Sequence, residues 1–181
     1  MLGENVFRET FIGQIKMSGG SPPQYHLAHF PVLFVRFGDD IREAPEADQL
    51  VARSYPNWPD KGMILHSRRI TILTASRHVR PHEAIRVIHV VEAMDPSVAL
   101  YTMGPKAVLG EHVDGKVTTP MEVRDGDPLQ PPGLYDGPVV PGPAVDYGYD
   151  VSAYRFEETG PHRIVWRLGD LVSNEILILV E

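Results

Sequence analysis

Residues 69–92 read RITILTASRHVRPHEAIRVIHVVE and decide the fold class. The first seven residues are rich in β-branched side chains, which favour strands. After a polar connection, residues 84–92 alternate at period two, and the side chains that share one face are Ile85, Val87, His89 and Val91. We therefore predict two neighbouring strands joined by a loop.

Further strand patterns extend along the rest of the chain. Asp114-Gly115 between valines predicts a hairpin with a type I′ turn, because both central residues of that turn need a positive φ. Only Pro45 to Ser54 has a helical pattern. The remaining predicted strands are Phe30 to Phe37, Ser97 to Met103, Val145 to Ala153, His162 to Leu168 and Glu175 to Val180.

Proline and glycine are the unusual part of the composition. The chain has 181 residues, which predicts one domain, 1–181, and it contains 17 Pro and 16 Gly. Residues 126–148 hold a large share of them, so we predict a long loop without regular structure over most of this segment. This loop either connects two strands and has no further function, or it acts as a lid or partner-binding loop that positions Leu134 and Tyr135.

These patterns predict an all-β protein, either an antiparallel β-sandwich or a cupin-like barrel. The run from Glu158 to Ile164, followed by Trp166, resembles the approach to the penultimate strand of immunoglobulin-like sandwiches, with His162 where those folds usually place Tyr. The resemblance implies a sandwich with an immunoglobulin-like arrangement. It covers about twenty residues and lacks both cysteines of that fold.

Charge and composition exclude several functions. The net charge of −7 disfavours nucleic-acid binding, and the absence of cysteine removes disulfides, thiolate metal sites and a cysteine nucleophile. The longest strongly apolar stretch is Ile176 to Val180, too short to span a membrane. The first residues do not show the basic start and the apolar run of a signal peptide, so we expect a cytoplasmic protein.

Histidines concentrate between His66 and His89. His78, His82, Glu83 and His89 are a candidate site for a divalent transition metal, since imidazole and carboxylate suit such ions. This set is partly similar to the first motif of cupin barrels, but its His-x3-His spacing with an adjacent Glu departs from the HxH pattern of that family. The same residues could act without metal, with His89 and Glu83 as catalytic acid and base. Alternatively, His89 is a hydrogen-bonded core residue and the others lie on the surface. The hairpin residues 111–112 meet this region if the two hairpins are neighbours.

Arginines in the same window suggest a ligand. Arg80 and Arg86 could hold a small acidic molecule, because guanidinium binds carboxylates in a bidentate geometry. The alternative is that the arginines form ordinary ion pairs with the acidic stretch Glu122 to Glu158. Tyr147 and Tyr149 share one face of a predicted strand, where they either pack in the core or stack on a ligand.

Two functions remain open from the sequence. The first is a non-catalytic binding or assembly module that contacts a protein partner or a second copy of itself. The second is a small β-barrel enzyme or small-molecule binder that uses the His/Glu site. No serine hydrolase, zincin or nucleotide-binding motif is present.

Overall fold

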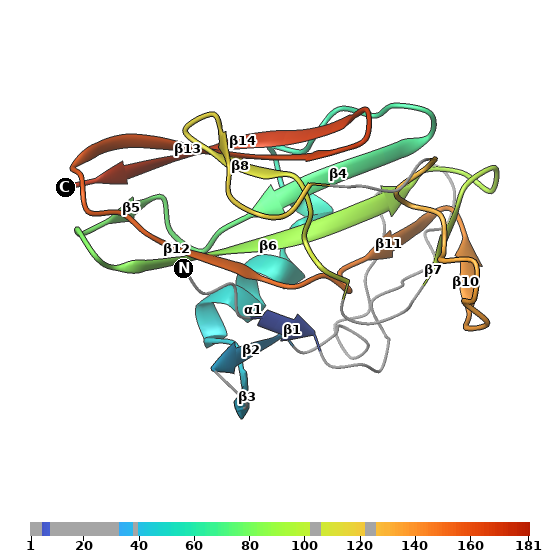
Figure 1. The fold of residues 1–181 in the computed structure, drawn as a ribbon, viewed down its shortest axis with the longest axis horizontal. Helices are drawn as coiled ribbons and strands as arrows, with labels where there is room; N and C mark the ends of the chain where they lie inside the picture. The colour runs from blue at the N-terminus through green and yellow to red at the C-terminus, as the bar shows by residue number, and fades with distance from the viewer. Residues whose placement is uncertain (1–4, 8–32, 38–39, 102–105, 122–125) are drawn as a thin grey trace.

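The structure is a computed structural model and describes residues 5–7, 33–37, 40–101, 106–121 and 126–181. Most of the regular structure in these ranges is β-strand, with one α-helix (Figure 1). No helix in the described part of the chain is long and apolar enough to cross a membrane.

The first large sheet is built around β6 (Ala84–Ala93). Strand β4 (Arg68–Leu73) pairs with one edge of β6, and its register places Ile72 opposite His89. Strands β11 (Ala144–Asp146) and β12 (Ser152–Arg155) pair in turn with the other edge. All of these pairs are antiparallel, so the prediction of neighbouring strands at 69–75 and 84–92 is confirmed.

The second large sheet has the order β5-β14-β13-β8-β9. Its long central pair, β13 (Gly160–Leu168) and β14 (Leu171–Val180), confirms the predicted antiparallel pair at the end of the chain. Strands β8 (Glu111–Val113) and β9 (Lys116–Val117) form the predicted hairpin, and Asp114 and Gly115 both have positive φ in the turn. The edge strand β5 (His78–Val79) pairs in parallel with β14.

Smaller elements surround the two sheets. Helix α1 (Glu46–Arg53) begins and ends one residue inside the predicted helix, and the 3-10 helix η2 (Tyr55–Asn57) follows it without having been predicted. The predicted strand at 30–37 appears as β2 (Leu33–Phe37), between β1 (Asn5–Phe7) and β3 (Asp40–Glu43). Strand β7 (Ala99–Tyr101) pairs with β10 (Val139–Pro141).

Two hydrophobic cores explain this arrangement. The inner core contains side chains from both large sheets, among them Ile72 and Val87 of the first and Ile164 and Trp166 of the second. The outer core lies on the opposite face of β6, where Ile88 and Val90 pack with α1, η2 and residues of the 145–151 segment. Figure 1 shows α1 on the side of β6 away from β13 and β14. Both faces of β6 are therefore buried, as its nearly continuous apolar pattern requires.

Asn174 joins the two sheets where β4 approaches β14. Its Oδ1 accepts a hydrogen bond from the Ile72 main-chain N–H at 2.9 Å, and its Nδ2 donates to the Ile72 carbonyl at 3.0 Å. The buried amide thus satisfies both main-chain groups of Ile72 that point away from β6.

One prediction about the 126–153 region is wrong. The proline-rich segment is free of regular structure over most of its length, with the two short strands β10 and β11 near its end. The strand predicted for 145–153 is interrupted between β11 and β12. There the Tyr149 N–H bonds to the Tyr147 carbonyl at 2.8 Å, a tight turn that reverses the facing of the side chains.

Candidate functional site

The four candidate metal ligands do not come together in one site. His78 is exposed and pairs with Glu181 at 3.5 Å, while His82 is exposed with a φ of 65°. Glu83 is exposed and accepts a hydrogen bond from the Arg80 main-chain N–H at 3.0 Å. His89 is fully buried in the inner face of β6. In the described ranges, no group of three or more His, Cys, Asp or Glu side chains is placed to hold a metal ion.

The histidine on β6 takes part in a buried hydrogen-bond network. His89 Nδ1 lies 3.1 Å from the Asp150 carbonyl, which can only accept, so Nδ1 carries a proton. His89 Nε2 lies 2.5 Å from Glu111 Oε2, and the His89 ring packs edge-on against Trp166 at a centroid distance of 4.9 Å. Both ring nitrogens therefore have a partner inside the protein.

Glu111 is the centre of this network. Its second carboxylate oxygen accepts short hydrogen bonds from the Ser152 and Tyr154 hydroxyls, and the Glu111 side chain is completely buried. Burial by itself would raise the pKa of Glu111, but the charge of His89 and the three hydrogen bonds outweigh it and lower the pKa below its ordinary value. We call the four residues His89, Glu111, Ser152 and Tyr154 the Glu111 cluster.

This cluster links the two sheets. Glu111 belongs to β8, whereas His89, Ser152 and Tyr154 belong to β6 and β12 of the other sheet. Neither of the two cavities described below is lined by any of the four residues. The cluster has the composition of an acid–base site, but its groups have hydrogen-bond partners inside the protein.

The arginines of the 66–89 window are mostly engaged in ion pairs. Arg86 of β6 contacts Asp48 of helix α1, a carboxylate with almost no exposure. The remaining pairs are Arg68 with Asp127, Arg69 with Glu92, and Arg77 with Asp60. Of these pairs between described residues, the one with Asp127 involves the acidic stretch that the sequence suggested. The Arg80 side chain is exposed.

A second buried carboxylate, Glu92, lies on the face of β6 that is directed towards the outer core. It contacts Arg69 at 2.5 Å and accepts a short hydrogen bond from the Tyr55 hydroxyl. Burial, followed by the charge and hydrogen bond of Glu92, raises the pKa of Tyr55 well above its ordinary value. Burial also lowers the pKa of Lys61, whose ammonium lies 4.2 Å from the centre of the Tyr55 ring. This group fastens η2 and its flanking loop to the sheet.

The two candidate tyrosines lie in different cores, so the expectation that they share a face is wrong. Tyr147 packs in the outer core, edge-on to Tyr55 at 5.9 Å. Tyr149 packs in the inner core against Trp166 at 5.3 Å, with the Lys106 ammonium 4.6 Å from its ring centre. The tight turn between them produces the difference. Both are buried, which leaves little of either ring for stacking on a ligand.

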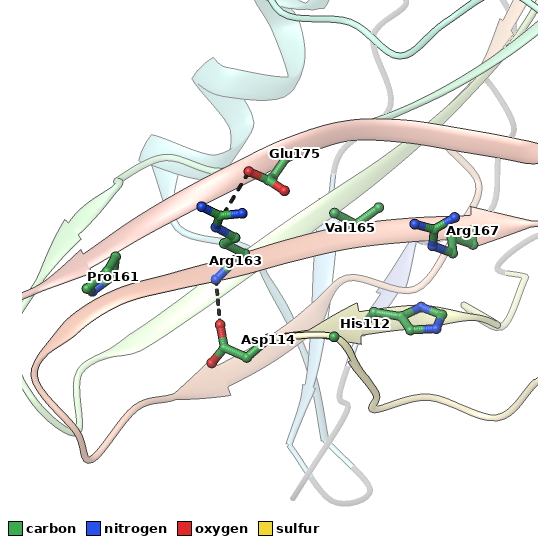
Figure 2. A pocket seen from close by; sticks show the side chains of 8 residues that line it. His112, Asp114, Pro161, Arg163, Val165, Arg167 and Glu175 are labelled. Atoms are coloured by element: carbon green, nitrogen blue, oxygen red, sulfur yellow. Dashed lines mark hydrogen bonds and ion pairs between the residues drawn. The ribbon is translucent and has the colours of Figure 1, made fainter.

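The larger described cavity is an open groove on the second sheet. It lies over β8, β13 and β14 on the face directed away from the inner core, which we call the outer face (Figure 2). Its volume is about 690 Å³. The lining residues are His112, Asp114, Gly115, Pro161, Arg163, Val165, Arg167 and Glu175.

Strand register explains how the groove acquires its side chains. On β13, Ile164 and Trp166 point inward, so the alternate positions Arg163, Val165 and Arg167 point outward. Opposite pairs in the antiparallel sheet share a face, which places His112 beside Val165 and Leu177 beside Arg163. The alternation of HRIVWRL could have identified these outward positions from sequence, but not the neighbours contributed by β8 and β14.

A smaller cavity of about 270 Å³ lies near the start of β4 and the turn between β13 and β14. Arg68 and Asp127 form an ion pair in its wall, and His66 and Asp170 also line it. Residues 126–128 of the proline-rich segment contribute to this wall. Comparison of the chain with protein-family models, with curated proteins and with solved structures finds no match.

Proposed function

We propose that this protein is a non-catalytic binding module that contacts a protein partner, or a second copy of itself, through the outer face of the β5-β14-β13-β8-β9 sheet. The observation that carries the proposal is the groove over β13, which combines two exposed arginines with apolar side chains. Arginine together with apolar surface is typical of protein interfaces, whereas a flat polar sheet face is not.

Apolar side chains around the groove strengthen the proposal. Leu177 is 46% exposed, Val117 is 46% exposed and Val172 is 37% exposed, all on strands of this sheet. Val117 lies opposite His112 in the register, and Val172 lies opposite Arg167. A contact that covers this face would remove apolar area from water, at about 25 cal/mol per Å².

Burial of the acid–base groups favours binding over catalysis. The enzyme alternative needs His89 and Glu83 to meet a substrate, yet His89 is sealed in the core and Glu83 contacts a main-chain N–H on the surface. A small-molecule site at Arg80 and Arg86 would have to break the ion pair between Arg86 and Asp48. The binding function requires neither change.

The proposed module is a β-sandwich rather than a cupin-like barrel. The shared inner core and the antiparallel pairing of nearly all strands in the two sheets support this arrangement. An immunoglobulin-like form is supported by β13, which carries the buried Trp166 and pairs with the final strand.

Photo-crosslinking tests the binding function. A photoreactive amino acid is placed at Leu177 on the outer face or, as a matched control, at the similarly exposed Leu50 on α1. In the cells that produce the protein, we expect a discrete crosslinked species from position 177 and none from position 50. A species of twice the chain mass identifies self-association, and a different mass identifies a partner. Equal labelling from both positions, or none from position 177 in folded protein, would refute the proposal.

A further inference from the structure

The groove on the outer face has one end where the charges are already neutralised. Arg163 Nε lies 3.9 Å from Glu175 Oε1, and the Arg163 main-chain N–H donates to Asp114 Oδ1 at 2.8 Å. The second Asp114 oxygen lies 2.7 Å from His162 Nδ1. Both acids that line the groove therefore have partners in the protein.

The other end of the groove has basic groups without acidic partners. In the described part of the chain, no acidic side chain lies within ion-pair distance of the Arg167 guanidinium. His112 Nδ1 donates to the Gly110 carbonyl at 2.9 Å, and its Nε2 has no hydrogen-bond partner among the described residues. Figure 2 shows Arg167 and His112 at the same end of the groove, on neighbouring strands.

We propose that this end of the groove binds a carboxylate side chain of an extended, partly apolar partner segment. The proposal rests on the binding function above and names the chemistry of the partner. Arg167 would form a charge-assisted pair with the carboxylate, and His112 would lie beside this pair on the neighbouring strand. Val165 and the exposed Leu177 and Val172 would contact the apolar side chains of the same segment.

Charge selects a carboxylate over a polyanion. The groove contains the two acids Asp114 and Glu175, and the chain has a net charge of −7. Nucleic acid would bring many phosphates towards this acidic protein, whereas one or two carboxylates need only the two unpaired basic groups. The exposed apolar side chains have no counterpart on a phosphate backbone. An acidic segment of a protein therefore fits the groove best.

A capped tripeptide serves as the probe. Acetylated and amidated Glu-Leu-Glu is titrated into the full chain, and binding is followed by NMR shifts of the β8 and β13 amides. Gln-Leu-Gln is the control peptide, since it keeps the shape and removes the charge. We expect Arg167→Gln to weaken binding of the acidic peptide about fivefold, as for an ion pair at a partly exposed site. Arg167→Lys keeps the charge but loses bidentate geometry, so its affinity for the acidic peptide should lie between those of the wild type and Arg167→Gln.

Arg53→Gln on α1 is the matched protein control, because it removes the same charge from an exposed position away from the groove. Its affinity should equal that of the wild type. Equal binding of the two peptides, no binding of the acidic peptide, or equal effects of Arg53→Gln and Arg167→Gln would each overturn the proposal. If the crosslink from position 177 persists undiminished in Arg167→Gln, the face binds a partner but carboxylate recognition is wrong. Loss of the crosslink in every background instead refutes the binding function itself.

Discussion

Replacing Glu111 by glutamine should lower the free energy of unfolding by about 3–5 kcal/mol. The glutamine side chain keeps the size of the glutamate but puts an NH₂ group where one acceptor oxygen stood. Three donors converge on the carboxylate, from His89, Ser152 and Tyr154. At least one of them would lose its acceptor inside the core, and each hydrogen bond to a charged group contributes about 1.5–3 kcal/mol.

Urea unfolding followed by tryptophan fluorescence measures this loss, since Trp166 packs directly against His89. The urea midpoint should fall while the slope of the transition stays unchanged. Glu157→Gln removes the same charge from an exposed position and should change stability by less than about 0.5 kcal/mol. If Glu111→Gln does not fold, Ser152→Ala removes a single donor and should cost about 1–3 kcal/mol. A loss below about 1 kcal/mol in Glu111→Gln would refute the account of the cluster.

The stability that Glu111 contributes should also depend on pH. The pKa of Glu111 is lowered from its ordinary value of 4.5, so the unfolded chain takes up a proton at higher pH than the folded protein does. The stability that Glu111 contributes is fully present above the unfolded pKa and is lost as pH falls through the folded pKa. The unfolding free energies of wild type and Glu111→Gln should therefore converge in acid. A constant difference down to acid pH would contradict this linkage.

Three further outcomes are expected. Asn174→Ala removes both hydrogen bonds to Ile72 of β4 and should lower the free energy of unfolding in urea by about 2–4 kcal/mol. An unchanged stability would contradict the role of Asn174 as a bridge between the sheets. Gly62→Ala places a methyl group 2.0 Å from a main-chain oxygen and should destabilise, whereas Gly133→Ala meets nothing within 4 Å and should be neutral. Partial burial alone would lower the pKa of His162, but the hydrogen bond and charge of Asp114 help to raise it from 6.5. That stabilisation is present below the unfolded pKa and is lost as pH rises through the folded one. Asp114→Asn should return the His162 pKa measured by NMR towards its ordinary value, and an unchanged pKa would exclude this cause.

Sequence patterns predicted the parts of the fold that depend on local chemistry. The hairpin at Asp114-Gly115 was predictable because its turn demands positive φ at two adjacent residues. The alternation of β6 was predictable because a strand has a fixed side-chain period. The alternation predicted for residues 145–153 failed at Tyr149, where a tight turn changes which way the side chains face.

Contacts between distant strands could not be predicted in the same way. The sequence flagged His89 and, separately, the hairpin residues 111–112, but it could not show that Glu111 turns inward while His112 turns outward. Which face of β8 meets the inner core depends on its register with β13, and that register is a tertiary property. The groove has the same origin, because Arg167 becomes a candidate only when β8 places His112 beside it.

Asn174 also has a consequence for the ageing of the protein. An uncovered strand edge offers free N–H and C=O groups to strands of other molecules and is a common origin of aggregation. The Asn174 amide occupies both groups of Ile72 on the edge of β4, in the manner of one peptide unit of a missing strand. Deamidation of this one side chain would replace the donor by a carboxylate facing a carbonyl. We expect this change to break the bridge between β4 and β14, so that old or heated protein unfolds at a lower urea concentration than fresh protein.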